Sequence, residues 1–378
     1  MGYVAMRGGE HAIAEALNAL DLLRAGATDP GADPGEALTI AAIRHQLRLL
    51  TDRVMGEGGL YAPDLAALAI KQAHGDPLEA AFILRAHRSN LPRLGTSPVH
   101  HGGELRLIRR ISAAFKEIPG GQRLGPGTDY LQRLFRLDLL NEDPQAVRAA
   151  VARILGDEIQ TKIPAMEFPG VVAGLRQEGL LPPSRPAQAA IDITREPLAL
   201  PVPRPARLAH LVRGETGGIL AMAYSTMRGY GYLHPTVAEL RVGYLPVRLP
   251  HPLTGELVEA GEMLITECEI VATHGGGPGK GGAAGKEGGQ PRLLLGYGAC
   301  VGHNEVKAIA MAMCDRAMLN GDERGPAQPA EDPEFVIALV DGIESMGFCS
   351  HYKLPHYVTF QADLENLRQA AHRAKGAL

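Results

Sequence analysis

The sequence predicts an α+β protein: an N-terminal all-helical domain followed by a mixed α+β domain with a largely antiparallel sheet. Residues 10–90 place apolar side chains at helical spacing, and three strand-like runs lie between residues 237 and 301. No regular alternation of strand and helix connects these runs, which argues against a parallel sheet. At 378 residues the chain exceeds the size at which one hydrophobic core stops growing, so two domains are expected.

The helical domain is predicted to span residues 1–95. Its helices are expected at residues 10–25, 37–54, 63–74 and 76–90. Pro63 and Pro77 stand near the starts of the last two helices, with Gly75 between them, as is typical of helix boundaries. The short connections indicate antiparallel packing of neighbouring helices.

The α+β domain is predicted to span residues 96–378 and to carry the catalytic site. A turn-rich stretch at 96–127 opens it, and 182–205 reads as a Pro-rich connector. Strands are expected at 237–249, 261–273 and 293–301. Helices are expected at 128–140, 144–156, 168–179, 207–227, 304–319, 332–346 and 361–375.

Composition excludes some classes of function. The formal net charge of −4 and the pI of about 6.4 provide no global basic field for nucleic acid. The chain has no run of about 18 apolar residues and no signal-peptide pattern at its start, so we expect a cytoplasmic protein without a membrane segment. Its four cysteines form no C-x-x-C pair, which favours small buried hydrophobic residues over a cysteine-ligated metal.

A glycine- and lysine-rich tract at 274–291 invites comparison with a phosphate-binding loop. Its Gly-Lys pairs lack the upstream glycine at the required offset and a following Ser or Thr, and no good helix pattern comes next. We therefore expect a flexible insertion between two strands.

His351 and His356 stand five residues apart in a Pro-containing loop beside a helix. Two imidazoles at this spacing can converge on one Zn²⁺ ion, and further ligands would have to come from elsewhere in the chain, a partner or water. The spacing is a weak signal in a chain with 14 histidines, so from the residues alone a chance pair stays open.

Tyr224 and Arg228 lie in a stretch that combines aromatic, polar and cationic side chains with glycines. Arginine binds phosphate in a bidentate manner, which suits an anionic substrate, and a glycine-capped helix end explains the pattern nearly as well. Nearby, Glu267 and Glu269 are expected on opposite faces of a strand, so that only one of them faces a site.

Arg106, Arg109, Arg110 and Lys116 form a second cationic cluster. If the segment is helical, the three arginines share one face. Phosphate binding and a solvated face or subunit contact are both compatible with this pattern.

Several sequence blocks carry a resemblance to a known family. They are YVAMRGGE (3–10), DRVMGEGG (52–59), LAIKQA (68–73), RRIS (109–112), IPGGQRLGP (118–126), AYSTMRGYG (223–231), TECE (266–269) and GFCSHYKLPHYV (347–358). In these blocks and their order the chain resembles the PhnI family, a subunit of the bacterial carbon–phosphorus lyase core complex. It departs from the family at 274–291 and in the Pro-rich connector.

The resemblance implies a chemistry. Family members, helped by partner subunits, replace the purine of ATP by methylphosphonate at ribose C1, giving α-D-ribose 1-methylphosphonate 5-triphosphate and adenine. Alone, the subunit is implied to act as a nucleosidase. The implied partners are the core subunits G, H and J and an associated ABC-type ATPase subunit, with two copies of this chain per hetero-oligomer. The resemblance also implies Zn²⁺ bound near the J interface by the histidines that match His351 and His356.

Roles for individual residues follow from the residue types in the matched blocks. Glu267, Glu269 and Tyr224 are the predicted catalytic residues, because a carboxylate can stabilise positive charge at C1 and the departing purine needs a proton. Arg228, Lys353, Arg109 and Arg110 are predicted to bind the substrate, with Mg²⁺ on the triphosphate.

Two alternatives stay open. The chain could be a non-catalytic scaffold that positions the radical C–P lyase subunit and supplies half of an interfacial zinc site. It could also be a self-sufficient zinc hydrolase, which would require a third protein ligand near the two histidines.

Overall fold

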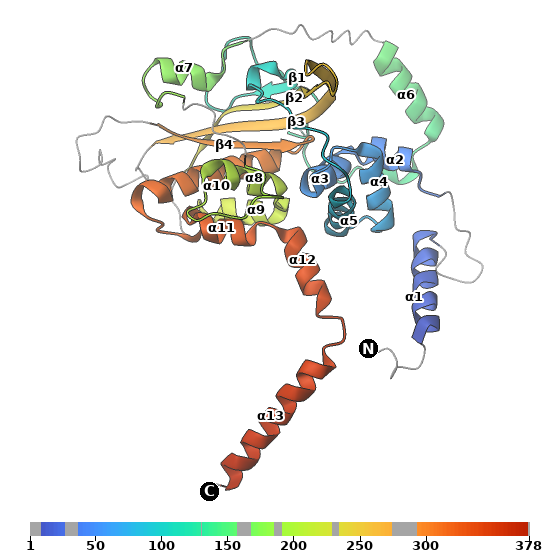
Figure 1. Cartoon of the computed structure of the whole chain (residues 1–378). Coiled ribbons are helices and arrows are strands. Elements are labelled where there is room, and N and C mark those ends of the chain that lie inside the picture. Colours follow the sequence, from blue (N-terminus) through green and yellow to red (C-terminus); the bar gives the residue numbers. More distant parts are fainter. Residues whose placement is uncertain are drawn as a thin grey trace. The chain divides into compact units, whose positions relative to one another are not determined.

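The computed structural model describes residues 9–26, 37–129, 131–156, 168–184, 191–228, 234–273 and 293–376. Helices occupy the N-terminal region, and a four-stranded antiparallel sheet with helices follows, which confirms the predicted α+β class (Figure 1). By their contacts, Met1–Pro92, Asp192–Ala221 and Pro333–Leu378 form a first unit, and Arg93–Ile191 with Met222–Asp332 forms a second. The predicted division of the chain into domains near residue 95 stays a prediction.

Some predicted features lie outside the described residues. These are the tract at 274–291, the first six residues of the block at 3–10, the end of the block at 223–231, and residues 185–190 of the connector. Within the described part of the chain, no helix combines the length and the apolar character needed to cross a membrane.

The N-terminal helices confirm the predicted ones, with one break. They are α1 (Gly9–Arg24), α2 (Ile40–Gln46), α3 (Arg48–Gly58), α4 (Pro63–Gln72) and α5 (Pro77–Ser89). The single helix expected at 37–54 is interrupted at Leu47, which separates α2 from α3. Asp76 caps α5 by accepting hydrogen bonds from the backbone N–H groups of Leu78 and Glu79, at 2.8 and 3.1 Å.

The remaining helices of the first unit come from later in the chain: α8 (Arg204–Arg213), α9 (Thr216–Ser225), α11 (Pro333–Leu339), α12 (Gly342–His351) and α13 (Tyr357–Gly376). The last four residues of α9 belong to the second unit. Close packing of α3 against α5 depends on Gly58, where a Cβ atom would lie 2.9 Å from the Leu84 side chain.

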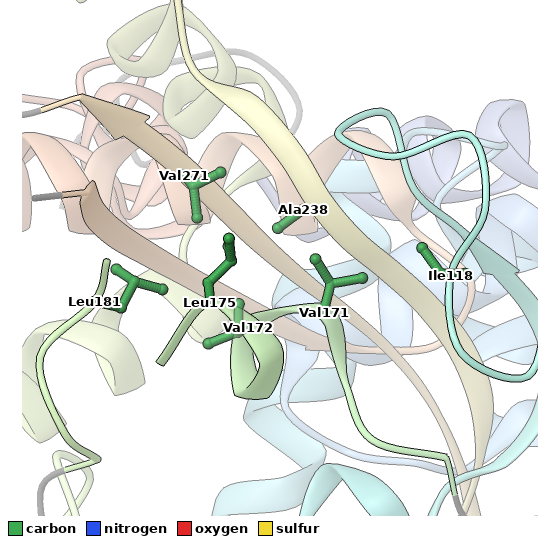
Figure 2. Close-up of a cluster of buried hydrophobic side chains, with 7 residues drawn as sticks. All are labelled: Ile118, Val171, Val172, Leu175, Leu181, Ala238 and Val271. Carbon is green, nitrogen blue, oxygen red and sulfur yellow. The ribbon is translucent and has the colours of Figure 1, made fainter. Parts of the chain in front are cut away.

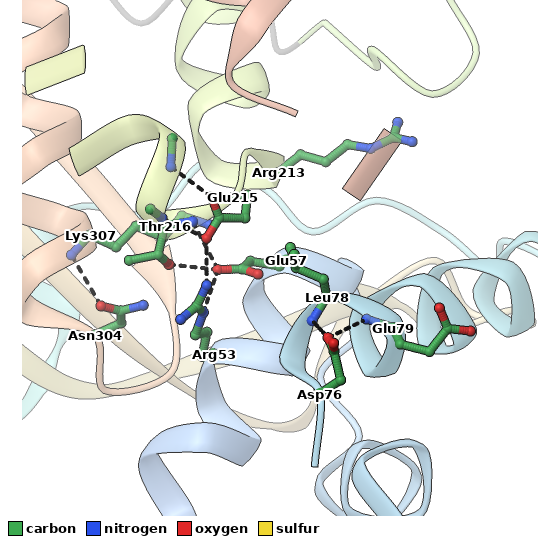
Figure 3. A network of polar contacts seen from close by, with 12 residues as sticks. Arg53, Glu57, Asp76, Leu78, Glu79, Arg213, Glu215, Thr216, Asn304 and Lys307 are labelled. Atoms are coloured by element: carbon green, nitrogen blue, oxygen red, sulfur yellow. Dashed lines mark hydrogen bonds and ion pairs between the residues drawn. The ribbon is translucent and has the colours of Figure 1, made fainter. Parts of the chain in front are cut away.

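Charged side chains also join these helices. We call Arg53, Glu57, Arg85, Arg213, Glu215 and Asp341 the helical cluster, part of which is drawn in Figure 3. Glu57 is fully buried, and its Oε1 accepts from Arg53 Nε at 2.9 Å and from the Thr216 backbone N–H and hydroxyl at 2.9 and 2.6 Å. Through Glu57 the cluster ties α3 to the start of α9.

The second unit is built on the strands β1 (Arg106–Ile111), β2 (Thr236–Pro250), β3 (Leu257–Thr273) and β4 (Leu293–Val301), in the spatial order β1-β2-β3-β4. All neighbours are antiparallel. The three predicted strands are confirmed. The basic segment of Arg106, Arg109 and Arg110 is a strand rather than a helix, because pairing with β2 supplies the partners for its backbone.

The helix predicted at 128–140 is wrong: the described residues there form only the 3₁₀ helix η3 (Leu137–Asn141). Leu131, Leu134 and Phe135 are exposed, so no packing surface supports an α-helix in this segment. The next two helices, α6 (Pro144–Gly156) and α7 (Val171–Gln177), lie where the sequence predicts them.

One face of the sheet is covered by α10 (Glu305–Arg324), which packs on β4 and β3. Gly296 and Gly298 make this approach possible, because a Cβ atom at either position would lie 2.1 Å from a backbone carbonyl oxygen of α10. Cys268 and Ile270 of β3 are buried, and Ile270 lies on the α10 side of the strand beside Gly296.

On the opposite face, α7 closes a small apolar core (Figure 2). The core consists of Ile118, Val171, Val172, Leu175, Leu181, Ala238 and Val271, with Leu293 and Leu295 packed against it. Side chains of β4 on this face are only partly buried, whereas those facing α10 are buried. This face of the sheet is therefore the more accessible one.

Candidate functional site

A group of charged and aromatic side chains occupies the face of the sheet that carries α7. We call Arg110, Glu239, Arg241, Glu267, Glu269 and Tyr297 the sheet-face cluster. In the strand register, Glu239 pairs with Glu269, Arg241 with Glu267, and Arg110 with Arg241. Because directly opposite residues of antiparallel strands project from the same face, the register itself gathers these side chains.

The expectation that Glu267 and Glu269 lie on opposite faces is wrong. Residues two apart in a strand project from the same face. Both carboxylates approach one guanidinium: Arg241 Nη2 lies 2.7 Å from Glu267 Oε2 and 3.8 Å from Glu269 Oε2. The two carboxylates predicted as catalytic are thus neighbours in a single site.

The three carboxylates of the cluster have unequal partners. Glu239 is fully engaged, since its Oε1 accepts from Arg110 Nε at 2.5 Å and its Oε2 from the Val171 backbone N–H at 2.9 Å. Glu267 accepts a 2.8 Å hydrogen bond from the Tyr297 hydroxyl in addition to its ion pair with Arg241. Among the ion pairs and hydrogen bonds between described residues, Glu269 takes part only in the 3.8 Å contact to Arg241.

The weaker pairing of Glu269 is accompanied by a raised pKa of its carboxyl. Burial first, and then the nearby Glu267 and Glu239, raise the pKa of its carboxyl to about 7 against the opposing effect of Arg241. The same environment raises the pKa of the Tyr297 hydroxyl, through burial first and then through Glu267. Near neutral pH, Glu269 can therefore hold or release a proton while Tyr297 stays a hydrogen-bond donor.

Arg241 is the cation on which both carboxylates depend. Burial lowers its pKa, but Glu267, Glu269 and Glu239 outweigh this effect and raise it overall. The guanidinium is held close to the backbone of Gly102, where a Cβ atom would lie 2.8 Å from Arg241 Nη2 and 2.9 Å from Glu267 Oε2. Glycine at this position is what allows the chain to pass over the ion pair.

Arg109 and Arg110, both predicted to bind substrate, are buried and already paired. Arg109 Nε lies 2.6 Å from Glu305 Oε1, and its Nη2 contacts Asp129. Arg110 is joined to Glu239 and to the Pro119 carbonyl oxygen, at 2.5 Å each. Only Arg110 belongs to the sheet-face cluster.

Tyr224 and Arg228 lie at and just after the end of α9, where Arg228 Nη1 donates a 3.3 Å hydrogen bond to the Tyr224 hydroxyl. Both side chains are exposed. No hydrogen bond or ion pair between described residues joins them to the sheet-face cluster.

His351, His356 and Lys353 cluster at the end of α12 in the first unit. The imidazole centroids of the two histidines are 5.1 Å apart. Each ring contacts a backbone carbonyl oxygen through Nδ1: His351 that of Phe348, and His356 that of Leu354 at 2.6 Å. A donating Nδ1–H leaves the Nε2 lone pair of each ring as the atom that can bind a metal.

The described residues contain no group of three or more His, Cys, Asp and Glu side chains that could hold a metal ion. Cys268, Cys300 and Cys314 are buried, as expected for small hydrophobic residues, whereas Cys349 is exposed. Burial raises the thiol pKa of Cys268, and that of Cys314 to about 12, which keeps both thiols protonated.

Sequence reasoning missed Glu239, Arg241 and Tyr297 as site residues. A signal was present, because Glu239 and Arg241 are the only charged residues between Thr236 and Val247, in a mostly apolar part of the strand where charged side chains are unexpected. Their meaning depends on pairing with β3, and strand pairing is not visible in a single strand.

The chain matches the family described as bacterial phosphonate metabolism protein (PhnI) over residues 2–374. The chain belongs to the PhnI family. This match covers nearly all of the sequence, including every strand and helix that contributes to the sheet-face cluster.

Named relatives support the same assignment. The chain is 60% identical over 375 residues to HtxH of Stutzerimonas stutzeri, whose name assigns it provisionally to C–P lyase as a subunit; the match covers 99% of this chain and 97% of HtxH. It is 44% identical to a protein of Escherichia coli (strain K12), over 97% of this chain and 98% of the relative. It is 41% identical to one of Rhizobium meliloti (strain 1021), over 97% and 94%. The last two are named alpha-D-ribose 1-methylphosphonate 5-triphosphate synthase subunit PhnI.

Proposed function

We propose that this chain is the subunit that displaces the purine of ATP by an alkylphosphonate at ribose C1, giving an α-D-ribose 1-alkylphosphonate 5-triphosphate. The observation that carries the proposal is the full-length similarity to two relatives named as this synthase subunit, at 41% and 44% identity. The sheet-face cluster supports it, because it supplies the two carboxyl functions that such a displacement needs.

The displacement breaks the bond between ribose C1 and the purine nitrogen. The bonding electrons leave with the purine, so C1 gains oxocarbenium character and the purine requires a proton. In our proposal Glu269 donates that proton, because its raised pKa of about 7 leaves it partly protonated near neutral pH. Glu267, which is ion-paired with Arg241, provides negative charge that stabilises the positive charge developing at C1.

Attack by the nucleophile on C1 completes the displacement. An oxygen of the phosphonate forms the new bond to C1, and the purine leaves carrying the proton from Glu269. When water replaces the phosphonate, the product is ribose 5-triphosphate and the water proton must be removed, a step that ionised Glu269 can perform. This exchange explains how the nucleosidase activity implied by the family resemblance would arise at the same site.

We propose Arg228 and Lys353, each within its own unit, as phosphate-binding residues, with Mg²⁺ bound to the phosphate oxygens. Both side chains are exposed. Arg109 and Arg110 are less suited to direct phosphate contact, because carboxylates already neutralise them. Tyr224, which accepts a hydrogen bond from Arg228, would position that guanidinium.

We further propose that the chain works in a cytoplasmic assembly with the G, H and J subunits and an ABC-type ATPase subunit, in two copies. His351 and His356 would hold Zn²⁺ through their Nε2 atoms, with the remaining ligands from the J subunit, water or substrate. The Nδ1 contacts to carbonyl oxygens fit this role, since such contacts fix the orientation of a ligating imidazole. When bound, the ion would link the subunits and polarise an oxygen ligand.

The synthase proposal is tested by incubating the assembled complex with ATP and methylphosphonate. We expect adenine release together with a new phosphonate ester signal by ³¹P NMR, and loss of both in the Glu269→Gln complex. Adenine release that is unchanged by Glu269→Gln would remove this residue from the reaction.

A second candidate function is a scaffold that supplies half of an interfacial zinc site without catalysing the displacement. The paired imidazoles at the end of α12 favour it, because two ligands suit an ion shared with another chain. Elemental analysis of complexes carrying His351→Ala and His356→Ala separates the two roles. The scaffold predicts loss of zinc and of assembly, whereas adenine release by the isolated wild-type subunit would establish its own catalysis.

A further inference from the structure

Ser97, His100 and Glu104 form a continuous hydrogen-bonded chain in the loop before β1, outside the sheet-face cluster. Ser97 Oγ lies 2.9 Å from His100 Nε2, and His100 Nδ1 lies 3.3 Å from Glu104 Oε2. A hydroxyl, an imidazole and a carboxylate in this order are the arrangement that activates a nucleophilic serine.

The hydrogen-bonding partners of Glu104 determine which nitrogen of His100 carries the proton. Glu104 accepts a hydrogen bond from the His101 backbone N–H at 3.0 Å and one from Arg248 Nη1 at 3.0 Å. The His101 N–H first, and then His100, lower the pKa of the Glu104 carboxyl, which is therefore an acceptor at neutral pH. His100 must then donate its Nδ1 proton to Glu104, so that its Nε2 is the base facing the Ser97 hydroxyl.

The three side chains have the exposure that a nucleophilic site requires. The His100 side chain is 11% exposed and that of Glu104 27%, while Ser97 is partly buried. The imidazole is thus largely shielded from water, and the carboxylate is partly exposed.

We propose that Ser97 is an activated nucleophile which attacks esters of carboxylic or phosphoric acids. The Ser97 oxygen would form a bond to the carbonyl carbon or phosphorus, and its proton would pass to His100 Nε2. The leaving alkoxide takes that proton as its bond breaks. Water then repeats the sequence through His100 and releases the acid, restoring the Ser97 hydroxyl.

The test is covalent labelling of the full-length protein with an alkyl fluorophosphonate, followed by peptide mass spectrometry. Fluoride is the leaving group, so an activated serine becomes a stable phosphonate ester. We expect one adduct on Ser97 in the native protein and a fall in labelling rate of about 10²-fold or more for His100→Gln. Ser112, which accepts hydrogen bonds from the N–H groups of Ala114 and Phe115, is the internal control and should stay unlabelled.

Two chromogenic esters then separate the substrate classes. Turnover of p-nitrophenyl acetate that is lost in Ser97→Ala indicates carboxylic esters, and turnover of bis(p-nitrophenyl) phosphate indicates phosphoric esters. A native protein without an adduct on Ser97, or with one that forms equally fast in His100→Gln or after heat denaturation, overturns the proposal. The hydrogen bonds would then serve only to order the loop. Because the wild-type peptide map decides the question, misfolding of a variant does not obscure it.

Discussion

Each unit of this protein contains a cluster of charged side chains at or near its core, and the two clusters differ in their balance. In the helical cluster, Arg53, Arg85 and Arg213 face the three carboxylates of Glu57, Glu215 and Asp341. In the sheet-face cluster, Arg110 and Arg241 face the three carboxylates of Glu239, Glu267 and Glu269. The charged residue types are the same, but the first cluster has equal numbers of both charges, whereas the second has one more carboxylate than guanidinium.

We expect that this difference separates a structural from a chemical role. Where the numbers of carboxylates and guanidinium groups are equal, the cluster is neutral and its ion pairs hold helices together. Where a carboxylate is left over, burial and like charge raise its pKa, which is how proteins prepare an acid for use near neutral pH. Glu57 and Glu269 are thus the residues whose replacement best contrasts the two clusters.

The largest expected effect is on the helical cluster. Glu57→Ala leaves Arg53 Nε and the Thr216 N–H and hydroxyl without their acceptor in a buried site, so we expect a loss of about 3–5 kcal/mol in the free energy of unfolding. Urea denaturation followed by circular dichroism measures it. The exposed ion pair of Arg44 and Asp64 is the matched control, and Arg44→Ala should cost less than about 1 kcal/mol. A Glu57→Ala protein as stable as this control would remove the structural role.

On the sheet face, the expected effect is on turnover. Glu269→Gln should reduce adenine release by about 10²–10⁴-fold, because it removes the proton donor while preserving shape. Stability at pH 7 should not fall, since the residue replaced is a carboxyl without its own counter-ion. Glu259→Gln changes an exposed carboxylate on the same strand and serves as the control. Equal turnover in the two variants would contradict the assignment.

The same carboxyl should make stability depend on pH. The pKa of Glu269 is about 7 in the folded state against 4.5 for an unperturbed glutamate, so the folded protein binds the additional proton between these pH values. The contribution of Glu269 to stability is therefore fully present below about pH 4.5 and is lost as pH rises through 7. The pKa difference corresponds to roughly 3 kcal/mol at most. Denaturant titrations of wild type and Glu269→Gln from pH 4.5 to 8 should diverge accordingly, and parallel curves would exclude the shift.

A smaller effect is expected from the neighbouring hydroxyl. Tyr297→Phe removes the hydrogen bond to Glu267 and leaves the Arg241 ion pair, so we expect turnover to fall by about tenfold, as for the loss of one hydrogen bond to a charged group. Tyr244→Phe is the control, because Tyr244 packs its ring against Arg106 away from the cluster. If both variants retain full turnover, Tyr297 does not help to position Glu267.

Local patterns in the chain were sufficient for most elements. The apolar spacing at 63–74 and 76–90, with Pro63, Pro77 and the capping Asp76, predicted α4 and α5 because these signals act within one helical turn. The strand-like runs predicted β2, β3 and β4 because strand propensity is also a local property of neighbouring residues. The segment at 106–111 gave no such signal, and its strand conformation depends on backbone pairing with β2.

The sequence by itself also determined the family and two of the carboxylates in the candidate site. Only the tertiary structure decided how they are arranged. Glu267 and Glu269 share a face because a strand alternates its side chains, and Arg241 and Tyr297 meet them because three antiparallel strands align in one register. A pKa depends on distances between groups and on burial, and both are set by residues far apart in the sequence. The raised pKa of Glu269 is therefore a property of the folded sheet.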